Sequence, residues 1–194
     1  GRSISKFAYE LAIAGKTMKF ETDAGMITAE IKSDTIVKLA LYKPKDLKTD
    51  IKITADNKQF EVSCLNTGVP HAVIFVDDIE NIDVVKCGRL IRFHKEFAPE
   101  GTNVNFVKVD KNNTILVRTY ERGVEDETLA CGTGVTASSI ISVLKEKVLS
   151  PVHIITRGKD NLTVFCSVSA DMDISDVYLE GPAIVAFTGK VKAE

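Results

Sequence analysis

The segment from which the fold is predicted is GTGVTASSIISVLKEK, residues 132–147. Its apolar side chains are spread around most of the circumference of a helix, as far as Lys145. A helix that is apolar nearly all round is buried rather than laid on a surface. The segment therefore predicts a central helix that is enclosed by the rest of the chain.

Runs typical of β-strands lie on both sides of this helix. Before it, we predict strands at residues 51–54, 60–65, 71–76, 105–109 and 114–119, and a short helix within residues 83–97. After it, we predict strands at residues 153–157, 162–168, 177–180 and 184–191. Strict alternation of strand and helix, which would indicate a doubly wound sheet, is missing. The pattern favours an α+β fold in which a mixed or antiparallel sheet curls around the buried helix.

The same order of elements occurs earlier in the chain. Residues 2–14 predict an amphipathic helix, and residues 17–21, 26–31 and 36–42 predict three strands after it. The sequence therefore indicates a duplicated unit. The second copy has a long strand-rich stretch before its helix and the first copy has none. We therefore expect the front of the first copy to be absent from this chain.

The polar stretch at residues 43–50 contains Pro44 and is the candidate linker between the two copies. We accordingly predict three parts. Residues 1–50 form the remainder of an N-terminal domain, and residues 51–183 form a C-terminal domain. Residues 184–194 form a closing strand that returns to the N-terminal domain.

Composition excludes several classes of function. The net charge is −2 without a basic stripe, so we predict no nucleic-acid partner. No apolar run approaches the roughly 20 residues of a membrane-spanning helix. The four cysteines form no CxxC pair and only three histidines are present, which argues against a structural zinc site. We expect free thiols in a reducing cytoplasm.

Residues 120–134, YERGVEDETLACGTG, carry the clearest chemistry. Cys131 precedes a glycine-rich helix start, where free N–H groups and the helix dipole favour an anion such as a carboxylate. The same dipole lowers the pKa of a thiol. This arrangement suits a thiolate that removes a proton from a carbon beside a bound carboxylate. The alternative is that Cys131 is only a small buried hydrophobic residue.

The run from Tyr120 to Gly134 resembles the second active-site signature of diaminopimelate epimerases, which begins Glu-Arg-Gly and ends Ala-Cys-Gly-Thr-Gly. Supporting segments follow the order of that family at residues 68–76, 102–106 and 181–183. Gly1-Arg2 resembles the tail of the family's first signature. The resemblance spans nearly the whole chain and implies the diaminopimelate-epimerase-like fold.

The resemblance implies a mechanism with two cysteines on opposite faces of the substrate α-carbon, without pyridoxal phosphate or metal. Cys131 resembles the second of the pair. The first would lie just ahead of Gly1, so we expect this chain alone to be inactive. The small-molecule substrate implied is diaminopimelate, and the family also implies a homodimer.

Other site residues follow from the same resemblance. The backbone of Gly132 and Thr133 would bind the α-carboxylate. The distal end of the substrate would meet Arg122 and Asn103, while Glu121 and His71 would line the pocket and help to set the ionisation of the thiols.

The chain departs from the family at three positions. Val69 lies where a substrate-binding asparagine is usual, and Asn66 is a candidate replacement. The loop at residues 124–126 is one residue longer than the common form. Ser3 lies where a cysteine often follows the arginine of the first signature.

Three other interpretations stay open from the sequence. The first is a related isomerase of the same fold, similar to proline racemases or to enzymes of phenazine pathways. The second is a catalytically inactive module that keeps a carboxylate pocket. The third is a cysteine hydrolase in which Cys131 and His71 form an acyl-enzyme.

Overall fold

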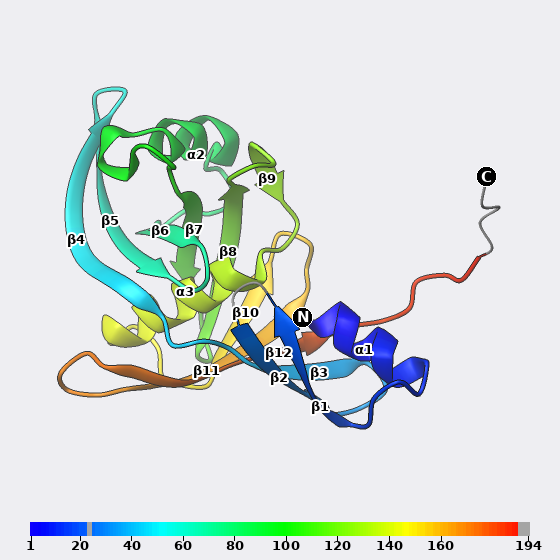
Figure 1. Ribbon diagram of the computed structural model, residues 1–194. Coiled ribbons are helices and arrows are strands. Elements are labelled where there is room, and N and C mark those ends of the chain that lie inside the picture. Colours follow the sequence, from blue (N-terminus) through cyan, green and yellow to red (C-terminus); the bar gives the residue numbers. More distant parts are fainter. Residues whose placement is uncertain (23–24, 190–194) are drawn as a thin grey trace.

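The computed structural model describes residues 1–22 and 25–189 (Figure 1). The helices are α1 (Arg2–Glu10), α2 (Val84–Arg92) and α3 (Gly132–Leu144), with a short 3-10 turn η1 (Lys95–Phe97). The strands are β1 (Thr17–Thr22), β2 (Gly25–Ile31), β3 (Ile36–Ala40), β4 (Lys45–Ala55), β5 (Lys58–Asn66), β6 (Pro70–Phe75), β7 (Asn103–Val109), β8 (Thr114–Glu121), β9 (Asp126–Thr128), β10 (Val152–Thr156), β11 (Asn161–Val168) and β12 (Ile174–Pro182).

The described strands form one continuous sheet in the order β1-β2-β3-β12-β11-β10-β8-β7-β6-β5-β4, with β9 paired to β8. The pairs β6–β7 and β8–β10 are parallel and the other pairs are antiparallel. In Figure 1 the half of the sheet from β4 to β12 curls around α3, while α1 lies against the smaller half. The predicted mixed sheet around a buried helix is confirmed.

Helix α3 is buried from Gly134 to Ser142. Its apolar residues pack into the largest core cluster, which includes Val135, Ile140 and Ile141. Two of its three serines bond within the helix: Ser139 donates to the carbonyl of Val135, and Ser142 donates to that of Ser138, whereas the hydroxyl of Ser138 has no partner among the described residues. Such bonds remove most of the cost of placing serines in a core.

The structure also shows the repeat. Helix α1 is followed by the antiparallel strands β1, β2 and β3, and α3 is followed by the antiparallel strands β10, β11 and β12. The third strands of the two units, β3 and β12, pair antiparallel with each other, with Leu39 opposite Leu179. The two units therefore meet at this strand pair, which we call the β3–β12 seam.

Helix α2 covers the outer side of the sheet at β7 and β8. A second core cluster, which includes Val84, Ile91 and Phe106, lies under it. The helix can approach closely because Gly88 lies over Tyr120: a Cβ at Gly88 would be 2.6 Å from Cγ of that ring. The tyrosine ring is fully buried by this contact.

The predicted linker is wrong for residues 45–50, because they belong to β4. This strand lies at the edge of the sheet and pairs with β5, with Lys45 opposite Asn66. Its register shifts twice, and Asp46 and Asp50 have positive φ angles of 57° and 59°. Polar residues are normal on an irregular edge strand, so a polar composition did not distinguish it from a loop. The domain division at residue 50, which stays a prediction, falls inside β4.

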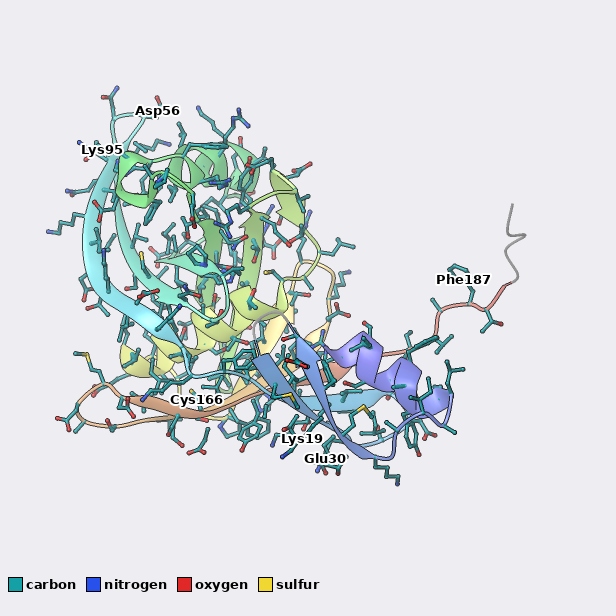
Figure 2. All side chains as sticks on the ribbon, viewed as in Figure 1. Lys19, Glu30, Asp56, Lys95, Cys166 and Phe187 are labelled. Atoms are coloured by element: carbon teal, nitrogen blue, oxygen red, sulfur yellow. The ribbon has the colours of Figure 1, made fainter. Side chains whose placement is uncertain are left out.

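The ends of two predicted elements also differ. Helix α1 stops at Glu10 instead of residue 14, because Ala12 adopts a positive φ of 54° and the chain turns back. Residues 184–189 form no strand, although residues 184–191 were predicted as one. Figure 2 shows Phe187 on a segment that leaves the body of the molecule. The rest of the predicted closing strand lies outside the described residues.

In the part of the chain that the structure describes, no helix has the length and apolar composition needed to cross a membrane. The same residues contain no cluster of three or more histidine, cysteine or acidic side chains that could hold a metal ion.

We predict that Gly88→Ala destabilises the protein, although alanine normally favours a helix. The new methyl group would overlap Tyr120, and overpacking of this kind costs about 1–3 kcal/mol of the free energy of unfolding. Urea denaturation measures this effect. The control is Gly15→Ala, where no atom lies within 4 Å of the new Cβ. Equal stability of the two variants would contradict the close contact.

Candidate active site

Three predicted site residues lie at the same end of three neighbouring strands. His71 on β6 is directly opposite Asn103 on β7. The next residue of β7, Val104, is opposite Tyr120 on β8, so Glu121 also lies at this end. The parallel pairing of β6 with β7 and the antiparallel pairing of β7 with β8 thus bring together residues that are 50 positions apart in the sequence.

The start of α3 lies at the same end of these strands. Thr67, in the loop after β5, donates a hydrogen bond of 2.9 Å to the carbonyl of Thr133. The first turn of α3 also packs closely on β7 at Gly134. A Cβ at Gly134 would be 3.3 Å from Cγ of Asn105 and 3.3 Å from Sγ of Cys131. The same Cβ would overlap Oδ1 of Asn105, so glycine is required for this approach.

Cys131 is the N-cap residue of α3 and is 9% exposed. Its Sγ lies 3.5 Å from the hydroxyl of Thr133. Burial raises the pKa of the thiol above its ordinary value, and the negative charge of Glu121 adds to the increase. The hydroxyl of Thr133 and the N–H groups of Thr133 and Gly134 lower the pKa, but by less than burial raises it.

The predicted low thiol pKa is therefore wrong in its direction. The helix start does favour the thiolate, as expected from the free N–H groups. Desolvation in the buried site outweighs this effect, because a charge is disfavoured where water is excluded. Sequence patterns report the helix start but not the depth at which the sulfur is buried.

His71 is 1% exposed, and its Nδ1 lies 3.1 Å from the side-chain nitrogen of Asn105. Among the described residues, its Nε2 has no hydrogen-bond partner. Burial lowers the pKa of the imidazole to about 3, and the positive charge of Arg122 contributes in the same direction. His71 is therefore neutral at physiological pH.

Asn103 connects two of these segments through its carboxamide. Its nitrogen donates to the carbonyl of Pro70 at 3.0 Å, and its oxygen accepts from the backbone N–H of Arg122 at 2.8 Å. The guanidinium of Arg122 has one acidic neighbour in the described residues, Glu100, at 3.8 Å. Glu100 is largely exposed, so this pair holds the arginine only weakly.

Glu121 accepts a hydrogen bond of 2.9 Å from Thr128 on β9, which fixes its carboxylate at the end of β8. The longer loop that follows is organised by Glu125. The carboxylate of Glu125 accepts from the backbone of Gly123, from Tyr120 and from Arg92. Glu125 thus anchors this loop on α2 and β8.

Asn66 lies at the end of β5, beside a cavity of about 130 Å³ that is also lined by His71 and Thr102. Its carboxamide closes the local turn: it donates to Asp46 and accepts from the N–H of Gly68. A larger cavity of about 440 Å³ is lined by residues of β8, including Arg118, and by residues of β10 and the turn that follows it, including Arg157. The larger cavity contains none of the predicted site residues.

The N-termini of two helices meet at the β3–β12 seam. A Cβ at Gly1, the N-cap of α1, would be 2.6 Å from Leu39, and a Cβ at Gly132 would be 3.3 Å from Leu179. These two leucines are directly opposite each other across the seam. An anion placed there would meet the positive ends of both helix dipoles.

Comparison with known proteins shows the family of the chain. The sequence profile described as Diaminopimelate epimerase matches residues 63–183. A diaminopimelate epimerase of Aquifex aeolicus is 46% identical over 196 residues, which cover 100% of this chain and 68% of the relative. One from Hydrogenobaculum is 44% identical, over 100% of this chain and 69% of the relative. The chain belongs to the diaminopimelate epimerase family.

Solved structures show that the fold of this family member is shared more widely. A probable proline racemase from Agrobacterium radiobacter has a TM-score of 0.78 at 14% identity, over 100% of this chain and 66% of that chain. A phenazine biosynthesis protein of Bacillus anthracis has a TM-score of 0.67 at 11% identity, over 92% and 71%. At such low identity the likeness concerns the fold alone.

Two polar residues of the site, Asn105 and Thr119, were not predicted from the sequence. Both are buried, and the hydroxyl of Thr119 donates 2.9 Å to the side-chain oxygen of Asn105. For Asn105 the available signal was a polar residue between Val104 and Phe106, whereas Thr119, which follows Arg118, gave no comparable signal. Their pairing depends on the register between β7 and β8, in which Asn105 lies opposite Thr119.

Two substitutions are expected to move the pKa of Cys131 in opposite directions. Glu121→Gln removes a negative charge and lowers the pKa, so alkylation of Cys131 reaches half its maximal rate at a lower pH. Thr133→Val removes a hydrogen bond that favours the thiolate, so the midpoint moves to a higher pH. Alkylation with iodoacetamide, followed by peptide mass spectrometry between pH 6 and 11, measures both changes.

Cys64 provides an internal reference in the same samples, because burial raises the pKa of its thiol to about 11 and neither substitution touches it. Midpoints for Cys131 that move in the same direction in both variants would contradict the electrostatic account of the thiol.

Proposed function

We propose that this chain supplies one thiol of a cofactor-independent epimerase that interconverts LL- and meso-2,6-diaminopimelate, a step in the biosynthesis of lysine and of peptidoglycan precursors. The observation that carries the proposal is the position of Cys131 at a buried helix start beside Glu121, in a chain of the diaminopimelate epimerase family.

The chemistry is an exchange of protons at one carbon. The thiolate of Cys131 accepts the proton as the α-carbon–hydrogen bond breaks, and a second thiol donates its proton to the opposite face. The reverse reaction exchanges the two roles. One proton leaves the substrate and one enters, so the reaction needs neither an oxidant nor a reductant.

The geometry of the helix starts supports a place for the α-carboxylate. We propose that it binds the N–H groups of Gly132 and Thr133, where a helix leaves its first donors without intrahelical partners. Negative charge that develops on the carboxylate as the proton leaves would be stabilised by the same donors. Burial of the site strengthens these interactions because water is excluded.

The distal end of the substrate is assigned to Arg122 and Asn103. A guanidinium binds a carboxylate through two charge-assisted hydrogen bonds. Arg122 is held only by a long contact with an exposed glutamate, so it can turn to a ligand. Asn66 is the remaining candidate for the asparagine that Val69 replaces, although it would first have to leave its bonds to Asp46 and Gly68.

The raised pKa of Cys131 suits a group that must act both as an acid and as a base. A thiol with a high pKa is a strong base once deprotonated, and an α-hydrogen of an amino acid is a very weak acid. We expect the charged groups of the bound substrate to determine whether Cys131 is present as the thiol or as the thiolate. No metal or pyridoxal phosphate is part of the proposed reaction.

The chain spans about two thirds of the length of its curated relatives. We propose that the 194-residue chain by itself does not turn over diaminopimelate, because Cys131 serves only one face of the α-carbon. We also propose that the enzyme works in the cytoplasm as a homodimer and has no nucleic-acid or membrane partner.

The test is exchange of the α-proton in the native protein that carries this chain. We expect LL-diaminopimelate in D₂O, without added cofactor, to gain deuterium at one α-carbon and to form the meso isomer. Cys131→Ala should slow this exchange by at least about 100-fold, the lower range for loss of a general acid–base group. Nuclear magnetic resonance of the substrate measures both the label and the isomer.

The matched control is Cys87→Ala, because Cys87 lies on α2 and packs in the second core cluster. It should keep the exchange rate of the native protein. Exchange that survives in Cys131→Ala would overturn the assigned role of this cysteine. Binding of diaminopimelate without any exchange in the native protein would support the inactive carboxylate-binding module instead.

A further inference from the structure

Asn105 is the only described polar side chain within hydrogen-bond distance of the buried ring of His71. Its side-chain nitrogen lies 3.1 Å from Nδ1 of His71, and the asparagine is itself fully buried. The imidazole can take part in this bond as donor or as acceptor, according to which ring nitrogen carries the proton. The orientation of the carboxamide therefore decides the tautomer of the histidine.

The carbonyl of Ala72 fixes that orientation, and the hydroxyl of Thr119 is compatible with it. The same nitrogen of Asn105 lies 3.2 Å from the carbonyl oxygen of Ala72, which can only accept a hydrogen bond. The hydroxyl of Thr119 lies 2.9 Å from the carboxamide oxygen, to which it donates. Rotating the carboxamide by half a turn would place its oxygen against the carbonyl of Ala72. The nitrogen of Asn105 therefore faces both Ala72 and His71.

A carboxamide nitrogen can only donate, so Nδ1 of His71 must accept. The single proton of a neutral imidazole is then on Nε2. That N–H group is buried and has no partner among the described residues. An unbonded buried donor destabilises the folded chain, so this atom is available to an acceptor that is not part of the described chain.

We propose that Asn105 is a positioning residue that fixes His71 as its neutral Nε2–H tautomer, so that the site presents a buried donor to an anionic or carbonyl oxygen of the substrate. The tautomer of His71 is a property of the chain alone. The role of its N–H group toward the substrate rests on the proposed function.

The proposal defines what His71 does. A neutral imidazole with its proton on Nε2 can donate through that atom but cannot accept a proton there. It is therefore not the base that activates Cys131, which is the role required by a cysteine hydrolase. The donor can instead stabilise negative charge on the substrate as the α-proton leaves.

Asn105 also connects the histidine to the catalytic helix. It lies under the first turn of α3, where a Cβ at Gly134 would be 3.3 Å from its Cγ and 3.3 Å from Sγ of Cys131. The same asparagine thus contacts the segment that carries the thiol and the ring that carries the donor. A substitution of Asn105 would therefore change the hydrogen bonding of His71 and leave the sequences of both active-site signatures unchanged.

The first experiment is a long-range nitrogen–proton correlation spectrum of the ¹⁵N-histidine-labelled 194-residue chain at pH 7. The spectrum of His71→Gln identifies the signals of His71. We expect the pattern of the Nε2–H tautomer. A proton on Nδ1, or a charged imidazolium, in the unmutated chain would overturn the proposal irrespective of any variant.

The second experiment uses Asn105→Asp, which keeps the shape of the side chain but can only accept. Its carboxylate should pull the proton to Nδ1 of His71, so the spectrum should change to that of the other tautomer or of the imidazolium. Asn57→Asp is the control, because Asn57 is exposed in the turn between β4 and β5. A folded Asn105→Asp chain whose His71 keeps the Nε2–H pattern would refute the role of Asn105.

The third experiment tests the link to catalysis in the native protein. We expect Asn105→Asp to lower kcat for α-proton exchange by about 10- to 100-fold, by analogy with the loss of a partner that orients a metal-bound histidine, with a smaller change in KM. An altered tautomer with unchanged kcat would refute the catalytic part alone. Absence of exchange in the native protein would refute the proposed function and leave the tautomer result standing.

Discussion

The contact between the first turn of α3 and β7 determines the rest of the site. The helix can lie against the strand only because Gly134 has no side chain to collide with Asn105. The contact places Cys131 at the end of the sheet where His71, Asn103 and Glu121 are already gathered by the register of β6, β7 and β8. A larger residue at position 134 would separate the thiol from the strands that surround it.

Burial of the site has opposite effects on its ionisable groups and on its dipoles. It raises the pKa of the Cys131 thiol and lowers the pKa of His71, so both groups are held in their neutral forms. It also strengthens every hydrogen bond that the site offers to a charged ligand. The consequence is a site whose thiol and imidazole are both uncharged before a substrate binds.

The sequence was sufficient for the parts of the fold that depend on local pattern. The buried α3, the repeat of a helix and three strands, and the family signature around Cys131 were all visible in it. What it missed depends on contacts between distant segments. The edge strand β4 is polar and can be recognised as a strand only from its pairing with β5. The role of Asn105 follows only from the register that places it beside His71 and Thr119. The direction of the thiol pKa likewise required the depth of burial, which no motif contains.

The duplicated unit explains why the site lies where it does. Each unit ends in a strand of the β3–β12 seam, and each contains a helix that starts with a glycine over a leucine of that seam, Gly1 over Leu39 and Gly132 over Leu179. Because Leu39 and Leu179 face each other, the two helix starts converge on one place rather than on two separate surfaces. A single unit could offer a carboxylate only one set of free N–H groups and one dipole. Because the last strands of the two units pair antiparallel, the free N–H groups of both helix starts are directed at the same small region, beside the thiol of Cys131.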